Sequence, residues 1–467
     1  MDDANLFYRM RSLDRLLGKE WRENDGKDGE LDKQEIYFAS PNELNDPMEG
    51  FGSIVFKGDK ILWHNFFKHY VMCLERRCNV YILCKELYKQ PSFDLNDMVI
   101  HNAFDDLYSQ ISQKMFNDIY KDFKLDCSKE IDTIATIKTP ITKDTLYYYL
   151  KIIHFVALAH INKHYIENGF IQNHSIDYFG IAKVHRDFLT PLIKCWEKYN
   201  IGDGQNKELD EMCRYAKYAG DSEIIKNLLN APPEINMTMY DFPISYLNYL
   251  DELIYPAYYV ACFLKKSRNS SLWGHYADGH KGVCLIFKNS ANGIKLTDLK
   301  PLPFEKINYN AEFETINFFE NLSNLAKFQI LKWHCGENNQ KSSVVDKIFK
   351  NEEEWRKDCR KTFYKKIVTK TKDWQYENEY RLVIDCQNKL EKQERIFQYN
   401  FDDLEGIIFG METPQDAKAI IIDIIWKKCI ANNRKEFKIY QAYYCKESGD
   451  IQYKLYRLIQ NYAQNLV

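Results

Sequence analysis

The sequence predicts an α+β fold in which a mixed, mainly antiparallel sheet core is split by a large helical insertion. Apolar residues alternate with period two near the N-terminus and in much of the last third of the chain, which is typical of strands. Between about 58 and 254 they recur at helical spacing instead, and glycine is sparse. We therefore expect residues 1–57 and 255–467 to form a discontinuous core domain and residues 58–254 to form a mostly helical insertion.

Composition limits the classes of function. A chain of 467 residues suggests two or three packing units, and 45% hydrophobic residues suit a globular protein. The net charge of −3 gives no bulk electrostatic case for binding nucleic acid or an anionic membrane. No apolar run approaches the roughly 18–20 residues of a membrane span, and the acidic start lacks the apolar core of a secretion signal, so we expect a cytoplasmic protein. The 13 cysteines show no CxxC spacing, which argues against a zinc site.

The N-terminal elements follow from local patterns. Leu6, Tyr8 and Met10 alternate as in a strand, and Ser12 stands where it can cap a following helix. Residues 18–34 are polar and contain glycine, which predicts a loop. The next strand is expected at 36–39.

A dense polar stretch follows that strand. It contains two turns, one at Ser40-Pro41-Asn42 and one at Asn45-Asp46-Pro47. Asx residues beside proline commonly close turns on their own backbone, and this interpretation stays open beside a binding role. The polar side chains concerned are Tyr37, Ser40, Asn42, Asn45, Asp46 and Glu49.

The insertion carries three histidines that could share a helix face, His154, His160 and His164. No acidic residue stands between His160 and His164 in the metalloprotease pattern. We therefore favour a satisfied, partly buried helix face over a metal site.

The stretch SLWGHYADGHKGVCLIF at 271–287 organises the second half of the chain. It predicts a short helical turn, a loop bounded by Gly279 and Gly282, and a buried strand at 283–287. A further strand is expected from Ala257. The polar and aromatic residues of the turn are either core anchors or pocket residues, namely Trp273, His275, Tyr276, Asp278 and His280.

A third polar cluster lies at 373–386. Glu377, Glu379 and Arg381 alternate with apolar positions, so they share one face of a predicted strand. This charged face is either an exposed rim, which is the default for charged faces, or the wall of a cleft.

The rest of the C-terminal half completes the sheet. Strands are expected at 306–309, 404–409 and 437–444, and residues 312–370 read as helical and charged. Thr413 is predicted to cap a helix whose first residue is Pro414.

The three polar clusters together resemble a bacterial family labelled domain of unknown function twenty-nine seventy-one. The helical insertion lies outside the resemblance, and the family label carries no settled activity. The matching motifs are Tyr8-Arg9, YFASPNELNDPMEG at 37–50, SLWGHYADGHKGVCLIF at 271–287, Trp374 with YENEYRLV at 376–383, and LEGIIFG at 404–410.

The order of these parts is also similar in outline to that of ADP-ribosyltransferases. The counterparts are Tyr8-Arg9, the YFAS strand at 37–40 and the E-x-E of Glu377 and Glu379. The resemblance implies NAD as substrate and cleavage of the nicotinamide glycosidic bond. A role in bacterial defence, including phage defence, or as a toxin would suit a cytoplasmic enzyme with a helical sensor insertion. No metal is predicted, and the acceptor and the oligomeric state are left open.

The chemistry of that reaction assigns roles to the residues. Positive charge builds on the ribose, so a carboxylate held near it stabilises the transition state. We expect Glu379 in that role and Glu377 orienting the acceptor, with His275 and Tyr276 as proton-transfer groups or hydrogen-bond donors. Arg9 would clamp a phosphate or a ribose oxygen, and Tyr37 would stack on nicotinamide. The remaining predicted substrate-binding residues are Tyr8, Ser40, Asn45, Asp46, Trp273, Tyr276 and Arg381.

Two other functions remain open. One is a metal-dependent nucleic-acid or nucleotide hydrolase, whose candidate ligands would be Asp46, Glu49, His275, Asp278 and His280. The other is a non-catalytic binding or sensor module, in which the aromatic insertion binds a partner and the polar clusters only stabilise the fold.

Overall fold

The chain forms two compact units. The computed structural model describes residues 5–46, 48, 53–87, 110–172, 177–199, 237–289, 293–309 and 314–460. We call residues 1–51, 256–313 and 364–467 the sheet unit, and residues 52–255 and 314–363 the helical unit. The domain boundaries given by the sequence stay a prediction. Packing differs from them chiefly in grouping residues 314–363 with the helical unit.

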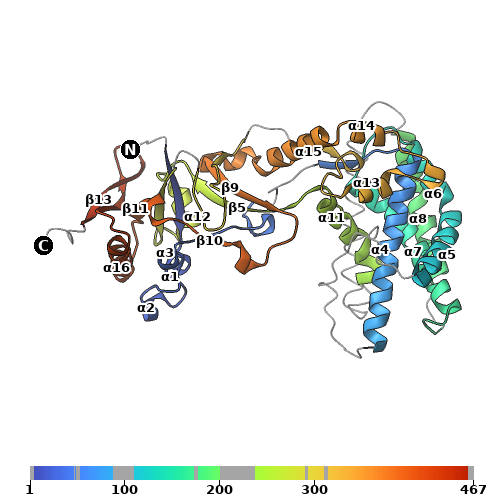
Figure 1. Ribbon diagram of the computed structural model, residues 1–467, viewed down its shortest axis with the longest axis horizontal. Coiled ribbons are helices and arrows are strands. Elements are labelled where there is room, and N and C mark those ends of the chain that lie inside the picture. Colours follow the sequence, from blue (N-terminus) through green and yellow to red (C-terminus); the bar gives the residue numbers. More distant parts are fainter. Residues whose placement is uncertain are drawn as a thin grey trace. The chain divides into compact units, whose positions relative to one another are not determined.

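The sheet unit is built on an eight-stranded sheet with the order β13-β12-β11-β6-β1-β5-β9-β7. Neighbours in this sheet are antiparallel except β11 and β12, which confirms the mainly antiparallel α+β fold (Figure 1). The strands are β1 Leu6–Arg11, β5 Ala257–Leu264, β6 Val283–Lys288, β7 Glu305–Lys306, β9 Glu379–Cys386, β11 Leu404–Phe409, β12 Glu436–Cys445 and β13 Asp450–Gln460.

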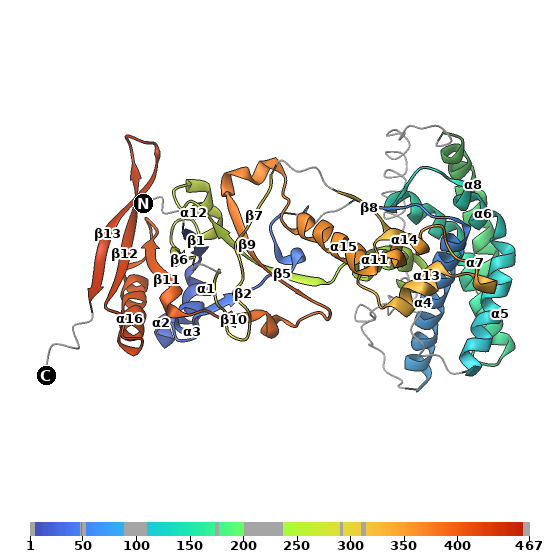
Figure 2. The same ribbon diagram turned by 45° about the horizontal axis from the view of Figure 1, so that its top comes forward.

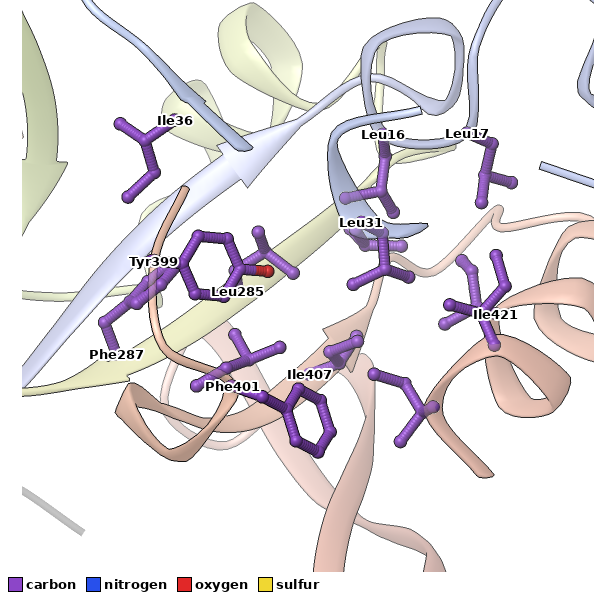
Figure 3. Packing of buried hydrophobic residues seen from close by; sticks show 14 of the residues in the cluster. Leu16, Leu17, Leu31, Ile36, Leu285, Phe287, Tyr399, Phe401, Ile407 and Ile421 are labelled. Atoms are coloured by element: carbon purple, nitrogen blue, oxygen red, sulfur yellow. The ribbon is translucent and has the colours of Figure 1, made fainter. Parts of the chain in front are cut away.

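Alternation along the strands gives the sheet two buried faces. Phe7 belongs to one apolar cluster, whereas Tyr8 and Met10 belong to the other. Figure 3 shows the first cluster, to which Leu16, Leu31 and the other labelled residues contribute. Helices α1 Leu13–Leu17, α3 Glu30–Lys33 and α16 Gln415–Ala431 supply part of it, and α12 Ser270–Tyr276 supplies part of the second cluster.

Two local predictions are wrong. Residues 18–34 are not only loop, because they contain α2 Trp21–Asn24 as well as α3. Trp21 and Leu31 are buried, and two isolated apolar residues show no period that reveals a helix. Thr413 is not the cap of α16: Pro414 takes that position, and the Thr413 hydroxyl donates to the Gly282 carbonyl at 2.9 Å.

A small sheet and short helices complete the sheet unit. Strand β2 Glu35–Tyr37 pairs antiparallel with β10 Ile396–Gln398. The 3₁₀ helices are η1 Pro41–Glu43, η6 Lys372–Glu377, η7 Lys392–Arg395 and η8 Phe401–Asp403.

The sheet opens between β1 and β5. Strand β1 pairs with β6 along its whole length, and β5 pairs with β9 along its whole length. Between themselves β1 and β5 pair only at Tyr8 and Leu264. Further along β5, Val260 instead exchanges two backbone hydrogen bonds with Ala39, just after β2. The two strands therefore diverge beyond one contact, and the segment at Ala39 bounds the gap.

The helical unit confirms the helical insertion predicted from the sequence (Figure 2). An aromatic cluster that includes Trp63, Phe66 and Trp333 fills its interior. None of the described helices is both long enough and apolar enough to cross a membrane. Its helices are α4 Lys60–Leu87, α5 Gln110–Asp126, α6 Ser128–Thr136, α7 Lys143–Glu167, α8 Tyr178–Tyr199, α11 Phe242–Ile254, α13 Lys327–His334 and α14 Val345–Lys350.

The helical unit also contains part of helix α15 (Glu352–Ile367), a small sheet and several short helices. Helix α15 runs across the boundary at 363 between the two units. A three-stranded sheet contains β3 Ser53–Phe56, β4 Ile141–Thr142 and β8 Thr315–Asn317. The π-helix η3 Met237–Asp241 and the 3₁₀ helices η4 Phe318–Glu320 and η5 Glu337–Asn339 complete the unit.

Candidate functional site

A pocket of about 520 Å³ occupies the opening between β1 and β5. Its lining comes from β1, β5, β9, α12, the turn after β2, and the segment from Lys370 to the end of η6, all within the sheet unit. Three predicted site residues, Ser40, Asp46 and Trp273, do not line it. The structure does bring together the remaining predicted residues, which are Tyr8, Arg9, Tyr37, Asn45, His275, Tyr276, Glu377, Glu379 and Arg381.

The charged face predicted at 373–386 is buried, so the default interpretation as an exposed rim is wrong. The predicted strand is also too long: Glu377 ends η6, the left-handed Asn378 follows, and β9 begins only at Glu379. Glu379 and Arg381 are 2% and 1% exposed and line the pocket. Glu379 accepts from Arg381 Nε at Oε1 over 2.8 Å and from Arg381 Nη2 at Oε2 over 3.2 Å. This two-point pairing fixes the orientation of the carboxylate.

Lys370 joins the two glutamates, and the sequence analysis missed it. Its ammonium lies 2.8 Å from Glu377 Oε2 and 3.1 Å from Glu379 Oε2, and its side chain is 6% exposed. It also lies 4.4 Å from the ring centre of Trp374, a cation–π contact. Trp374 belongs to the motif that suggested the family. The position of Lys370 shortly before this motif was the one feature of the sequence that could have pointed to it.

The two carboxylates ionise differently. Burial alone would raise the pKa of Glu379, but the Arg381 guanidinium and the Lys370 ammonium outweigh it and lower that pKa to about 2. Burial raises the pKa of Glu377, and Lys370 offsets this effect only in part. Burial would lower the pKa of Lys370, but Glu379 and Glu377 together raise it. Glu379 is therefore an anion at neutral pH, whereas Glu377 binds a proton more readily.

Helix α12 brings an aromatic hydroxyl to this pair. Asn269 caps α12 by accepting from the backbone N–H groups of Ser271 and Leu272. At the other end of α12 the Tyr276 hydroxyl donates to Glu377 Oε1 at 2.6 Å. Burial and the Glu377 carboxylate raise the pKa of Tyr276, so its proton stays on the phenol. His275 is exposed and also lines the pocket.

Arg9 forms the opposite, cationic side of the pocket. It is 4% exposed, donates from Nη2 to the Tyr37 carbonyl at 3.1 Å, and lies 5.2 Å from the Phe263 ring centre. In the part of the chain that the structure describes, Arg9 Nε and Nη1 have no hydrogen-bond partner. Burial and the nearby Arg11 lower the pKa of Arg9 to about 9. Arg11 itself pairs with Glu30 at 2.7 Å.

The turn after β2 has a structural part and a pocket part. The Tyr37 hydroxyl donates to Glu43, which also accepts from Ser40 and pairs with Arg395 at 3.2 Å. Ser40 and Glu43 form a capping box on η1, so Ser40 stabilises the turn and does not reach the pocket. Asn45 does line the pocket.

Asp46 and Trp273, the other two predicted residues outside the pocket, are buried and have structural roles. Asp46 Oδ1 accepts from the Met48 backbone N–H at 2.9 Å, as in an Asx turn. Trp273 is fully buried in the second apolar cluster and donates to the Ser267 carbonyl at 2.7 Å. It is a core anchor.

No metal centre emerges among the described residues, where no three His, Cys, Asp or Glu side chains gather in a way that could hold an ion. Glu49, one of the ligands considered for a hydrolase, lies outside the described residues. On α7 each histidine has its own partner. His154 contacts the Tyr70 hydroxyl and the Thr238 carbonyl, His160 contacts Asp126, and His164 contacts Asp122. The acidic partners come from α5, which the spacing along α7 did not reveal.

Comparison with known proteins adds one finding. The model of the family described as protein of unknown function (DUF2971) matches residues 272–382. No curated protein matches the chain, and no solved structure matches it either. The matched span includes Tyr276, Lys370 and Glu379. The match supports, for residues 272–382, the family that the sequence predicted.

Proposed function

We propose that the pocket of the sheet unit binds NAD and cleaves its nicotinamide glycosidic bond, transferring ADP-ribose to an acceptor. One observation carries the proposal. A single pocket holds a carboxylate that stays ionised, Glu379, and a buried arginine, Arg9, two of whose nitrogens have no hydrogen-bond partner among the described residues. Its volume of about 520 Å³ suits a small organic ligand.

The glutamates supply the chemistry. When the bond between ribose C1′ and the nicotinamide nitrogen breaks, the electron pair leaves with nicotinamide and positive charge builds on the ribose. Glu379 remains negative near that charge, because its pKa is about 2. The acceptor then attacks C1′ and loses a proton. The raised pKa of Glu377 supports a role as the base that orients the acceptor and takes its proton.

The other side of the pocket would hold the substrate. Arg9 would donate from Nε and Nη1 to a phosphate of the dinucleotide, which is the ligand geometry a guanidinium fork prefers. The ring of Tyr37 would stack on nicotinamide, and His275 at the exposed edge would transfer protons. Tyr8, Asn45, Tyr276 and Arg381 would complete the contacts.

Nicotinamide release tests this function. The purified chain is incubated with NAD beside two variants, Glu379→Gln and the exposed control Glu412→Gln. Wild type and Glu412→Gln should release nicotinamide, and Glu379→Gln should lose roughly a hundredfold in rate, because the transition state loses its anion. Equal release from wild type and Glu379→Gln would remove Glu379 from the mechanism.

The same proteins separate catalysis from sensing. Thermal unfolding with and without NAD reports binding, since a ligand of the native state raises the melting temperature. A thermal shift without nicotinamide release would favour a nucleotide sensor. If the protein shows no thermal shift with NAD and releases no nicotinamide, the proposed function is rejected.

A further inference from the structure

We infer that Lys370 is a positioning residue that holds Glu377 and Glu379 side by side as a working pair in the pocket. The catalytic role of this pair rests on the proposed function, whereas the positioning role of Lys370 rests on its contacts. Lys370 is the cation that contacts both carboxylates, at 2.8 and 3.1 Å. Two buried carboxylates this close repel each other unless a cation lies between them.

The two glutamates depend on Lys370 to different degrees. Glu379 also has the Arg381 guanidinium on both of its oxygens. Glu377 has the neutral Tyr276 hydroxyl on Oε1 and Lys370 on Oε2. Removing the Lys370 charge therefore affects the ionisation of Glu377 more than that of Glu379.

The backbone around Lys370 is attached, through residues 307–309, to Glu379 at the start of β9. The Lys370 N–H donates to the Asn308 carbonyl at 3.2 Å, and Asn308 N–H donates to Val368 at 2.7 Å. One residue earlier, the Ile307 N–H donates to the Glu379 carbonyl at 3.1 Å, and the Tyr309 hydroxyl accepts from the Glu379 N–H at 2.8 Å. These bonds fix the ammonium relative to the carboxylates.

Several groups from different elements set the charge state of Glu377. If Glu377 takes the acceptor's proton, the rate must fall on acidification as Glu377 becomes protonated, which gives the pH–rate profile an acid limb. Lys370 lowers the pKa of Glu377, so without the Lys370 charge this acid limb should move to higher pH. The titratable and charged groups that face Glu377 are Lys370, Tyr276 on α12, Glu379 on β9, Tyr309 after β7, and Tyr376 on η6. Arg381 acts on the pair through Glu379.

The activity test compares Lys370→Met with Lys370→Arg across pH. In Lys370→Met the maximal rate of nicotinamide release should fall about tenfold or more, and the acid limb should move up by at least about one pH unit, with a smaller change in KM for NAD. Lys370→Arg keeps the charge and should restore the acid limb. An unshifted limb in Lys370→Met would reject the inference.

A second readout needs no activity. Melting temperatures are measured at pH 5 and pH 8. The melting temperature of Lys370→Met should lie further below that of wild type at pH 8 than at pH 5, because at pH 8 Glu377 must ionise without its partner. Adding Glu377→Gln to Lys370→Met should shrink this difference between the two pH values. The matched control is Lys418→Met. Lys418 is also buried in the sheet unit, but its partner is the Gln441 amide at 2.8 Å, so its deficit should not depend on pH.

These outcomes separate the two claims. If wild type releases no nicotinamide, the proposed function fails, and the melting data still decide the role of Lys370. If the deficit is equal at both pH values, the inference fails whatever the activity. Should Lys370→Met not fold, the double variant Lys370→Met/Glu377→Gln decides: recovery of a folded protein supports the coupling, and no recovery rejects it.

Discussion

Arg9 combines burial with unpartnered donor groups among the described residues, which is the combination expected of a side chain that binds a ligand. It is buried, its guanidinium carries a desolvation cost, and two of its nitrogens lack partners among the described residues. Replacing such a group with an apolar one of similar size is often neutral or stabilising. We therefore expect Arg9→Met to unfold at an equal or higher temperature than wild type while losing the thermal shift caused by NAD or ADP-ribose, measured by differential scanning fluorimetry.

A structural arginine should behave in the opposite way. Arg434 donates from Nη1 to the Phe401 carbonyl at 3.1 Å and to the Leu404 carbonyl at 2.6 Å, away from the pocket. Arg434→Met should cost about 1–3 kcal/mol of stability and keep the nucleotide shift. If Arg9→Met instead destabilises the protein and keeps the shift, Arg9 is structural.

At the scale of single residues, the sequence predicted those that motifs expose and missed those that folding brings in. Glu379 and Arg381 stood out because they alternate on one strand. The signal for Lys370 was weaker, namely its place shortly before Trp374, because its contacts with Glu377 and Glu379 depend on how the segment before η6 packs on residue 308. Trp273 stood out for its residue type, but burial made it a core anchor.

At the scale of elements, local periodicity predicted strands well and their pairing not at all. The expected strand at 404–409 coincides with β11, and that at 283–287 lies within β6. The opening between β1 and β5 depends on which residues pair across more than 240 intervening positions, from Tyr8 to Leu264. No local pattern encodes that register. Strand β13, with exposed apolar residues such as Leu455, was also missed.

The opening predicts that filling it will block the ligand. Cys262 lies on β5, lines the pocket, and is two residues from the last β1–β5 pair at Leu264. A phenylalanine there would occupy pocket volume beside Glu379, which the Cys262 thiol contacts. Cys262→Phe should weaken NAD binding by about tenfold or more, measured by calorimetric titration.

Its control is a cysteine outside the pocket. Cys445, at the end of β12, does not line the pocket. Cys445→Phe should bind nucleotide as wild type does. Equal binding by Cys262→Phe and Cys445→Phe would argue against a ligand in the opening between β1 and β5.

At the scale of the whole molecule, the switch from period two to helical spacing predicted the α+β class and a helical insertion. It did not reveal that residues 314–363 group with the helical unit, because that depends on contacts between distant segments. One such contact is the ring packing of Phe66 against Trp333 at 6.5 Å. Each unit has an apolar core of its own, and a chain of this kind commonly unfolds in more than one step.

The two units should respond differently to mild acid. In the helical unit, burial lowers the pKa of His154 to about 3 and that of His334 to about 4. The unfolded chain binds these protons near pH 6.5 and the native state does not, so stability falls as pH drops below that value. In the sheet unit, burial opposes ionisation of Glu379 but its cations lower the pKa to about 2, so this group's contribution is lost only below about pH 4.5.

Calorimetry at pH 7 and pH 5 tests this difference. By pH 5 each of the two histidines should cost about 2 kcal/mol, which lowers the melting temperature of the helical unit by about 4–8 °C per histidine. The melting temperature of the sheet unit should not fall in this way, because the raised pKa of Glu377 favours its folded state on acidification. His154→Gln should lose its share of the shift, because glutamine carries no titratable proton, and it thereby identifies which transition belongs to the helical unit. A shift of the same size in wild type and His154→Gln would mean that His154 already carries its proton in the folded protein.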